Sequence, residues 1–150
     1  MLQLLINRLI GKFKKRAKNS TRAFDLGIRG EKLAVRFLKR EKGYRVIERN
    51  WRCKNEEIDI IAEDGEVLVF FEVKTSMGES LVPTYYRVTA KKKRVLERAC
   101  KRYLRSRSPR KKHFRFDIIT VKFCQEGKSS IEHYMNVRLF SKNFHVLGDE

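Results

Sequence analysis

Two carboxylates and a lysine beside apolar runs carry the clearest chemical signal in this sequence. Asp59 lies within Glu57–Ala62, and Glu72 and Lys74 follow the apolar residues of Glu66–Thr75. A charged group among such residues is costly to bury unless it is paired or bound to a metal. Mg²⁺ prefers oxygen ligands, usually one or two carboxylates together with water and substrate phosphate oxygens. The pattern therefore predicts a site for a divalent cation and a phosphate ester.

The turn between the two segments decides whether the acids meet. Asp64-Gly65 is a strong signal for a two-residue hairpin turn, which places Glu63 opposite Glu66. In that register Asp59 and Glu72 are diagonal neighbours on one face of the hairpin, and the lysine two residues further on shares this face. A two- or four-residue loop preserves this arrangement, whereas a three-residue loop or a bulge reverses it.

A third carboxylate belongs to a predicted helix. Glu31 shares a stripe at helical spacing with Gly27, Ala34 and Leu38, so this stripe should face the sheet. The small residues near Glu31 leave room for a close approach. A carboxylate on an inward face needs a partner, and we expect Glu31 to bind a metal or to orient the site.

Each acid also has a purely structural explanation. Glu72 or Asp59 would form an ion pair with Lys74 where the sheet emerges into solvent, and Glu31 would cap a helix or pair with the same lysine. In the chemical interpretation, Asp59 and Glu72 hold Mg²⁺ or Mn²⁺, which activates water and offsets phosphate charge. Lys74 then orients the water or stabilises developing charge, and the neighbouring acids favour its ammonium form. The sequence leaves both explanations open.

The rest of the chain supplies an ordered set of elements in one α/β domain. Helical spacing predicts helices over Asp25–Lys42, which stops at Gly43, and over about Thr89–Arg105. The order is helix, three strands, helix, two strands. The strand-like runs are Tyr44–Arg52, Glu57–Ala62, Glu66–Thr75, Phe114–Phe123 and Ile131–Val137.

The charge of the chain favours a polyanionic partner. Thirty-six Lys and Arg against 18 Asp and Glu give a formal net charge of +18, which self-repels unless a polyanion relieves it. Lys91–Arg115 holds 13 basic residues and one acid, Glu97. Such a run grips phosphates without reading bases, and the alternative is a solvated helix face. The predicted nucleic-acid-binding residues are Lys91, Lys92, Arg98, Lys101, Arg102, Arg105, Arg110, Lys111 and Lys112.

Residues 1–22 form a distinct extension before a domain over residues 23–150. Met1–Asn19 carries six basic residues, no acid and an apolar stripe at helical spacing. This extension would dock on the domain or form an arm without fixed order, in preference to lying on a membrane surface. Cys53, Cys100 and Cys124 form no Cys-x-x-Cys pair, which suits reduced thiols in a cytoplasmic protein.

Six ordered blocks over about Phe24–Val137 resemble the YraN family of uncharacterised bacterial proteins. That family is similar in turn to archaeal Holliday-junction resolvases and the restriction-endonuclease-like superfamily. The resemblance implies a mixed sheet flanked by helices, with an active centre on the central hairpin. It places Glu31, Asp59, Glu72 and Lys74 at the superfamily's acid, acid, acid and lysine positions. The blocks are Gly27-x-x-Gly30-Glu31-x-x-Ala34, Gly43-Tyr44, Glu48-Arg49-Asn50-Trp51-Arg52, Glu57-Ile58-Asp59-Ile60-Ile61, Phe71-Glu72-Val73-Lys74-Thr75 and Arg115-Phe116-Asp117.

Two positions depart from the family pattern. Glu56 stands where the family usually has Gly before Glu-Ile-Asp, and this puts the preceding turn in question more than the metal site. Ser76 stands where the family often has Arg, so one potential phosphate contact is absent.

Two hypotheses about function follow. The first is a metal-dependent endonuclease that acts on DNA, with branched or structured DNA as the substrate that the resemblance favours. The second is a non-catalytic nucleic-acid-binding protein with a nuclease-derived fold, because fold does not entail function. A homodimer follows only by analogy with the resolvases.

Overall fold

The computed structural model describes residues 2–78, 89–107, 113–124 and 127–139, with side chains from residue 21 onward. The order of its elements is the predicted one, and strand and helix boundaries agree with the sequence patterns to within a few residues. Only the first helix is much longer than predicted. The elements are α1 (Leu2–Arg40), β1 (Arg45–Cys53), β2 (Glu56–Asp64), β3 (Val67–Met77), α2 (Ala90–Ser106), β4 (His113–Phe123) and β5 (Ser129–Tyr134).

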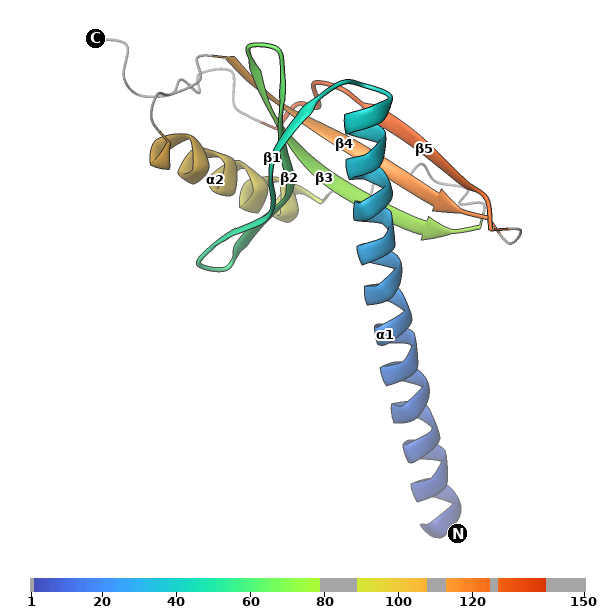
Figure 1. Cartoon of the computed structure of the whole chain (residues 1–150). Coiled ribbons are helices and arrows are strands. Elements are labelled where there is room, and N and C mark those ends of the chain that lie inside the picture. The colour runs from blue at the N-terminus through green and yellow to red at the C-terminus, as the bar shows by residue number, and fades with distance from the viewer. Residues whose placement is uncertain (1, 79–88, 108–112, 125–126, 140–150) are drawn as a thin grey trace.

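The five strands form one mixed sheet in the order β1-β2-β3-β4-β5. Neighbouring strands are antiparallel except β3 and β4, which are parallel. Parallel strands need a crossover connection, and α2 lies within it. Helices α1 and α2 cover opposite faces of the sheet (Figure 1). The predicted α/β class with a mixed sheet flanked by helices is confirmed.

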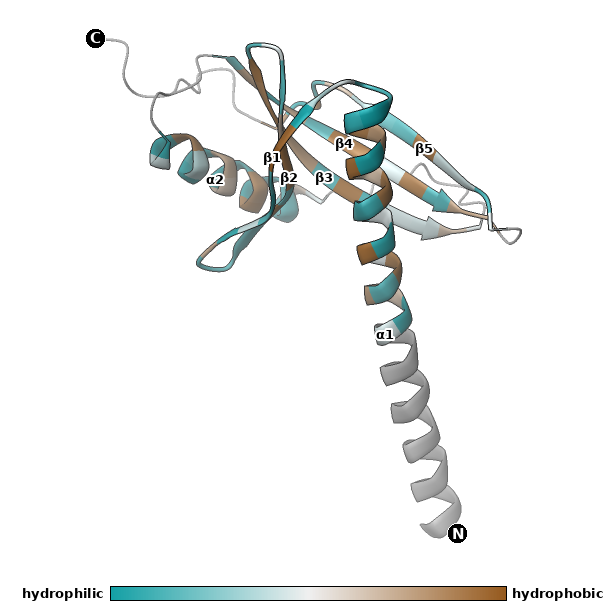
Figure 2. Ribbon diagram, in the orientation of Figure 1, coloured by the Kyte–Doolittle hydropathy of each residue, from teal (hydrophilic) through white to brown (hydrophobic). Residues whose placement is uncertain are grey.

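Each face of the sheet has its own hydrophobic core. On one face, α2 buries Leu96 and Tyr103 against Phe70 and Phe116. On the other face, α1 buries Ala34 and Leu38 against a second set of strand residues, Ile60, Val69, Phe71, Ile119 and Val121. The middle strands accordingly contain runs of apolar residues, which appear brown in Figure 2. A strand covered on both faces has no solvent side, which explains the continuous apolar runs in the sequence.

The N-terminal extension and the first core helix form a single helix. We predicted separate segments over Met1–Asn19 and Asp25–Lys42, but α1 runs from Leu2 to Arg40. No proline interrupts this stretch, and polar residues at positions 19–21 are neutral within a helix and do not end it. The first half of α1 extends away from the sheet (Figure 1). In the described part of the chain, no helix is long and apolar enough to cross a membrane.

The predicted register of the central hairpin is wrong by two residues. The turn is Gly65-Glu66 and not Asp64-Gly65, so that Asp64 pairs with Val67. Gly65 occupies the first turn position with a φ of 58°, a left-handed conformation that glycine adopts without strain. Because the shift is an even number of residues, every side chain keeps its predicted face.

Strands β2 and β3 separate beyond the hairpin. Their pairing ends at Ile60 and Phe71. Beyond this point β2 pairs only with β1, as far as the pair Cys53–Glu56. Strand β3 pairs only with β4, as far as the pair Met77–Phe123. We call this divergence the fork.

A buried polar network joins β4 to β5. Asp117 is fully buried and accepts hydrogen bonds from Arg115 Nε at 3.1 Å and from the Asn136 backbone N–H at 2.8 Å. Its second oxygen lies 2.8 Å from His133 Nε2, and Arg115 also donates to the Tyr44 hydroxyl. Arg115 and Asp117 thus form a structural ion pair, and His133 lies in the core with its Nε2 on Asp117 and its buried Nδ1 without a hydrogen-bond partner.

Helix α1 crosses β3 at a close contact between Gly30 and Thr75. A Cβ built on Gly30 would lie 1.9 Å from Thr75 Cγ2, whereas one on Gly27 would meet nothing within 4 Å. Glycine at position 30 therefore sets how closely the helix approaches the sheet. It also sets the position of the neighbouring residue, Glu31.

We predict that Gly30→Ala destabilises the protein by roughly 1–3 kcal/mol because the methyl group overlaps Thr75. Gly27→Ala is the matched control and should stabilise by up to ~1 kcal/mol through helix propensity. Chemical denaturation measures both values. Adding Thr75→Ala to Gly30→Ala should recover part of the loss. Equal effects of the two glycine substitutions would contradict the packing explanation.

Candidate active site

Asp59 and Glu72 are the first residues beyond the paired part of the hairpin, one on each side of the fork. They follow the last pair, Ile60 and Phe71, and are therefore equivalent positions of the two strands instead of the predicted diagonal neighbours, and their charges interact. Where the ladder ends, the Val73 backbone N–H donates to Asp59 Oδ2 at 2.7 Å. The Asp59 side chain thus accepts a hydrogen bond from the Val73 N–H at a point where the backbones of β2 and β3 no longer pair.

Two lysines from different elements neutralise Glu72. Lys74 Nζ lies 2.6 Å from Glu72 Oε1, and Lys92 Nζ in the first turn of α2 lies 3.3 Å from the same oxygen. Thr89 caps this turn by accepting a hydrogen bond from the Lys92 backbone N–H. Glu72 is only 3% exposed, and its other oxygen, Oε2, is buried with no hydrogen-bond partner.

Glu31 approaches the two acids from α1. The charges of Asp59 and Glu72 lie close enough to interact with its carboxylate. The side chains of Asn50 and Arg49 lie close enough to favour the ionised form of Glu31, and the charge of Glu57 opposes it. The structure therefore brings all four predicted residues, Glu31, Asp59, Glu72 and Lys74, to the fork.

Burial raises the proton affinity of two of these acids, Asp59 and Glu31. Burial, followed by the charge of Glu72, raises the pKa of Asp59 to about 7, against the opposing effect of the Val73 N–H. Burial also raises the pKa of Glu31, and the hydrogen bond from Asn50 opposes this shift. The folded structure therefore favours the protonated forms of Asp59 and Glu31.

The residues fit a divalent cation held by two carboxylates. Among the residues that the structure describes, no group of three or more His, Cys, Asp or Glu side chains is arranged to hold a metal ion. Mg²⁺ needs fewer protein ligands, because it retains several waters and takes phosphate oxygens. The unpartnered Oε2 of Glu72 and the crowded carboxylate of Asp59 are the acceptors that such an ion would take.

The predicted basic surface is only partly free for a ligand. Lys101 forms an ion pair with Glu97 at 2.8 Å, and Lys92 pairs with Glu72. Lys91 and Arg105 are exposed on α2. Arg110, Lys111 and Lys112 lie outside the described residues.

Glu56, which departs from the family pattern, forms ion pairs with two further arginines of the predicted basic surface. Its oxygens lie 3.0 Å from Arg98 Nε and 2.9 Å from Arg102 Nη1. Glu56 is buried near the start of β2, so this cluster ties the β1–β2 hairpin to α2. No local pattern predicts the pairing, because the partners are more than forty residues apart in the chain.

Asn50 is the site residue that the sequence patterns did not single out. It lies in the middle of β1 with a φ of 50°. A signal was present, since asparagine is depleted in strands and enriched in left-handed conformations.

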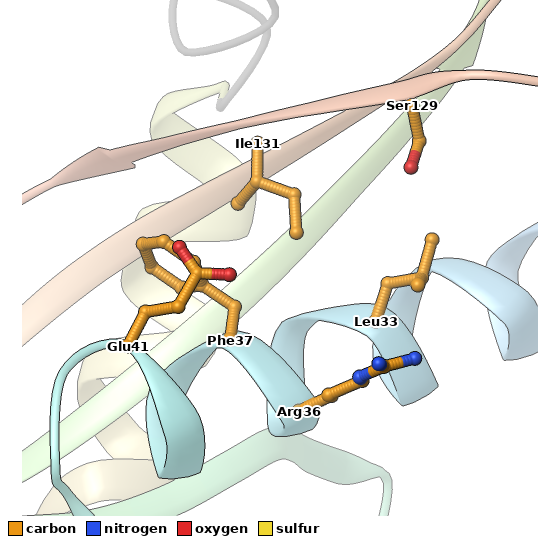
Figure 3. Close-up of a pocket in the computed structure, with 6 residues that line it drawn as sticks. All are labelled: Leu33, Arg36, Phe37, Glu41, Ser129 and Ile131. Atoms are coloured by element: carbon orange, nitrogen blue, oxygen red, sulfur yellow. The ribbon is translucent and has the colours of Figure 1, made fainter.

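A hollow lies between α1 and the edge strand β5 (Figure 3). Leu33, Phe37 and Ile131 extend into it, and Arg36 and Glu41 flank it. It shares no residue with the fork and does not change the assignment of the site.

The model of the uncharacterised protein family UPF0102 matches residues 30–121. The chain belongs to the UPF0102 family. A UPF0102 protein of Geobacter metallireducens is 40% identical over 111 residues, covering 74% of this chain and 89% of the relative. One of Beutenbergia cavernae is 38% identical, covering 75% of this chain and 94% of the relative. One of Caldicellulosiruptor saccharolyticus is 36% identical, covering 76% and 86%.

This membership confirms the resemblance to the YraN family, which is UPF0102. The matched UPF0102 region includes the four residues at the fork and all of α2. It does not include the first 29 residues, among them the projecting half of α1.

We predict that Asp59→Asn stabilises the metal-free protein at alkaline pH. The pKa of Asp59 in the folded protein is about 7, which lies above its ordinary value. The contribution of Asp59 to the free energy of unfolding is therefore complete below about pH 4, where the carboxyl group is protonated, and is lost as pH rises through 7. Asparagine stays neutral and still accepts from the Val73 N–H. In EDTA at pH 8, the free energy of unfolding should rise by roughly 2–4 kcal/mol, with the difference vanishing near pH 4.

Denaturant titration at several pH values measures this difference. Asp25→Asn, at an exposed position on α1, is the matched control and should change stability by less than ~0.5 kcal/mol. A pH-independent effect of Asp59→Asn would show that the ionised Asp59 carboxylate does not lower the free energy of unfolding.

Proposed function

We propose that this protein is a metal-dependent endonuclease acting on DNA. The observation that supports this most directly is the fork, which brings Asp59 and Glu72 together with Lys74 and leaves a buried Glu72 oxygen without a partner. The basic surface beside it supports a polyanionic substrate. The similarity of the family to Holliday-junction resolvases favours branched DNA.

Asp59 and Glu72 would hold the cation, which, when bound, lowers the pKa of water and offsets phosphate charge. The Lys74 ammonium lies beside Glu72, where it can orient a water molecule or stabilise charge on a phosphate oxygen. Lys92 lies near enough to Glu72 to exchange that carboxylate for a substrate phosphate. Glu31 would orient water from the α1 side.

The second candidate function is nucleic-acid binding without cleavage. The two lysines on Glu72 Oε1 favour it, because they neutralise this buried acid without a metal. In that case the fork is a structural ion cluster. The basic surface then carries the whole function.

We predict that the protein cuts labelled DNA in Mg²⁺ or Mn²⁺ and not in EDTA. Asp59→Ala should lower the cleavage rate by about 100-fold or more while DNA binding persists, because it removes a carboxylate that would hold the cation. The assay compares linear duplex with a four-way junction. Asp25→Ala, an acid outside the site, is the control variant.

Cleavage that survives Asp59→Ala unchanged would disprove the assignment of the site. Binding on every substrate without metal-dependent cutting would establish the non-catalytic function instead. A preference for the junction over linear duplex would identify the substrate class.

We predict that Lys91→Gln with Arg105→Gln weakens DNA binding in a salt-dependent manner. Removing two phosphate contacts should reduce the slope of log affinity against log salt by about 2, whatever the DNA sequence. Fluorescence anisotropy at several salt concentrations measures it. Lys39→Gln with Arg40→Gln, exposed at the end of α1, removes equal charge elsewhere. Equal slopes for the two variants would rule out α2 as the binding surface.

A further inference from the structure

Two lysines share one oxygen of Glu72, but they hold it differently. Lys74 Nζ, from the same strand, lies 2.6 Å from Glu72 Oε1, and the Lys74 side chain is 27% exposed. Lys92 Nζ reaches this oxygen from α2 at the longer distance of 3.3 Å, and its side chain is 40% exposed. A part-exposed ammonium group regains water readily when it leaves, and Glu72 would keep Lys74 as its partner. Lys92 is therefore the partner that Glu72 can lose at the lower cost.

The position of Lys92 on α2 opposes the electrostatics of a helix. Thr89 caps α2 and accepts a hydrogen bond from the Lys92 backbone N–H, so Lys92 lies in the first turn. That turn contains three lysines, Lys91, Lys92 and Lys93, and no acid. The helix macrodipole favours anions at this end and disfavours cations. In the absence of a ligand, Glu72 is the anion that Lys92 contacts, and a phosphate group approaching from solvent would supply another.

Lys92 competes with a metal ion for Glu72. The carboxylate is 3% exposed, its Oε2 has no hydrogen-bond partner, and its Oε1 holds both ammonium groups. A divalent cation on Oε2 would share one buried carboxylate with two positive charges, and charges of like sign repel strongly at such short range. The departure of Lys92 removes one of these charges. Metal binding and the departure of Lys92 therefore favour each other.

We propose that Lys92 couples the binding of the metal to the binding of nucleic acid by exchanging Glu72 for a phosphate. With neither ligand present, Lys92 neutralises Glu72 and disfavours the cation. A phosphate that takes Lys92 leaves the fork free to bind the cation more tightly. By linkage, the bound cation strengthens phosphate binding by the same factor. The proposal rests on the metal-dependent function proposed above and adds a regulation of that site, because the cation is held tightly only when a polyanion is present.

The first test measures the Mn²⁺ affinity of the full-length protein without DNA, by electron paramagnetic resonance. Lys92→Gln removes the competing ammonium group and should tighten Mn²⁺ binding roughly fivefold or more. Lys91→Gln, at an exposed position in the same turn, is the matched control and should change the affinity by less than about twofold, because solvent and salt screen an exposed charge.

The direction of the effect is decisive. A residue that only supports the fork would loosen the metal when it is removed. An unchanged or weaker Mn²⁺ affinity in Lys92→Gln would therefore overturn the proposal. An equal gain in Lys91→Gln would also overturn it, because the effect would then be one of net charge.

The second test is a double-mutant cycle on DNA affinity in EDTA, where no metal contributes. Glu72→Gln should free Lys92 for a phosphate and increase the magnitude of the slope of log affinity against log salt by about 1. In a Lys92→Gln background the same substitution should leave this slope unchanged, and the cycle subtracts the loss of the acidic charge itself. Equal changes in the two backgrounds, or no change in either, would overturn the exchange.

The two tests separate this proposal from the nuclease function. Mn²⁺ binding that Lys92→Gln tightens, in a protein that does not cut DNA, would refute the nuclease function and leave the coupling in place. Metal-dependent cleavage together with equal Mn²⁺ affinities of wild type and Lys92→Gln would refute the coupling alone. If neither protein binds Mn²⁺, the metal-dependent function and the coupling both fail.

Discussion

The separation of β2 from β3 is the constraint on which the candidate site depends. A continuous hairpin would pair the backbone of both strands past Asp59 and Glu72, and the two carboxylates would then face each other on a covered sheet. Because pairing stops at Ile60 and Phe71, both acids lie where the sheet divides, with Glu31 able to reach them from α1 and Lys92 from α2. The Val73 N–H that loses its strand partner is satisfied by Asp59 itself.

Charge is distributed unevenly over this basic protein. At the fork, burial of Asp59 and Glu72 places acids together in a chain whose net charge is +18. Two arginines of α2, Arg98 and Arg102, in contrast pair with a single buried acid, Glu56, at the start of β2. The site and its surroundings are therefore not set by net charge. They are set by which carboxylates the fold places beside which cations.

The sequence predicted the elements and the common face of the acids correctly, although the hairpin turn was wrong. The sequence allows a two-residue turn at either Asp64-Gly65 or Gly65-Glu66, and glycine supplies the positive φ in the observed turn, Gly65-Glu66. An even shift preserves side-chain parity, which is why Asp59, Glu72 and Lys74 stay together. The proximity of Asn50 to Glu31 was missed because it joins a strand to a helix, and the pairing of Glu56 because its partners lie on a distant helix.

Local sequence patterns determined three features: the helices, which follow a period of 3.6 residues, the strands buried on both faces, and the basic run after β3. These follow from nearest-neighbour sterics and from the burial of apolar side chains, which adjacent residues encode. Contacts between distant residues were decided only by tertiary packing. The fork, the close approach of Gly30 to Thr75 and the pairing of Glu72 with Lys92 depend on how two helices cover opposite faces of one sheet. No local spacing specifies those distances.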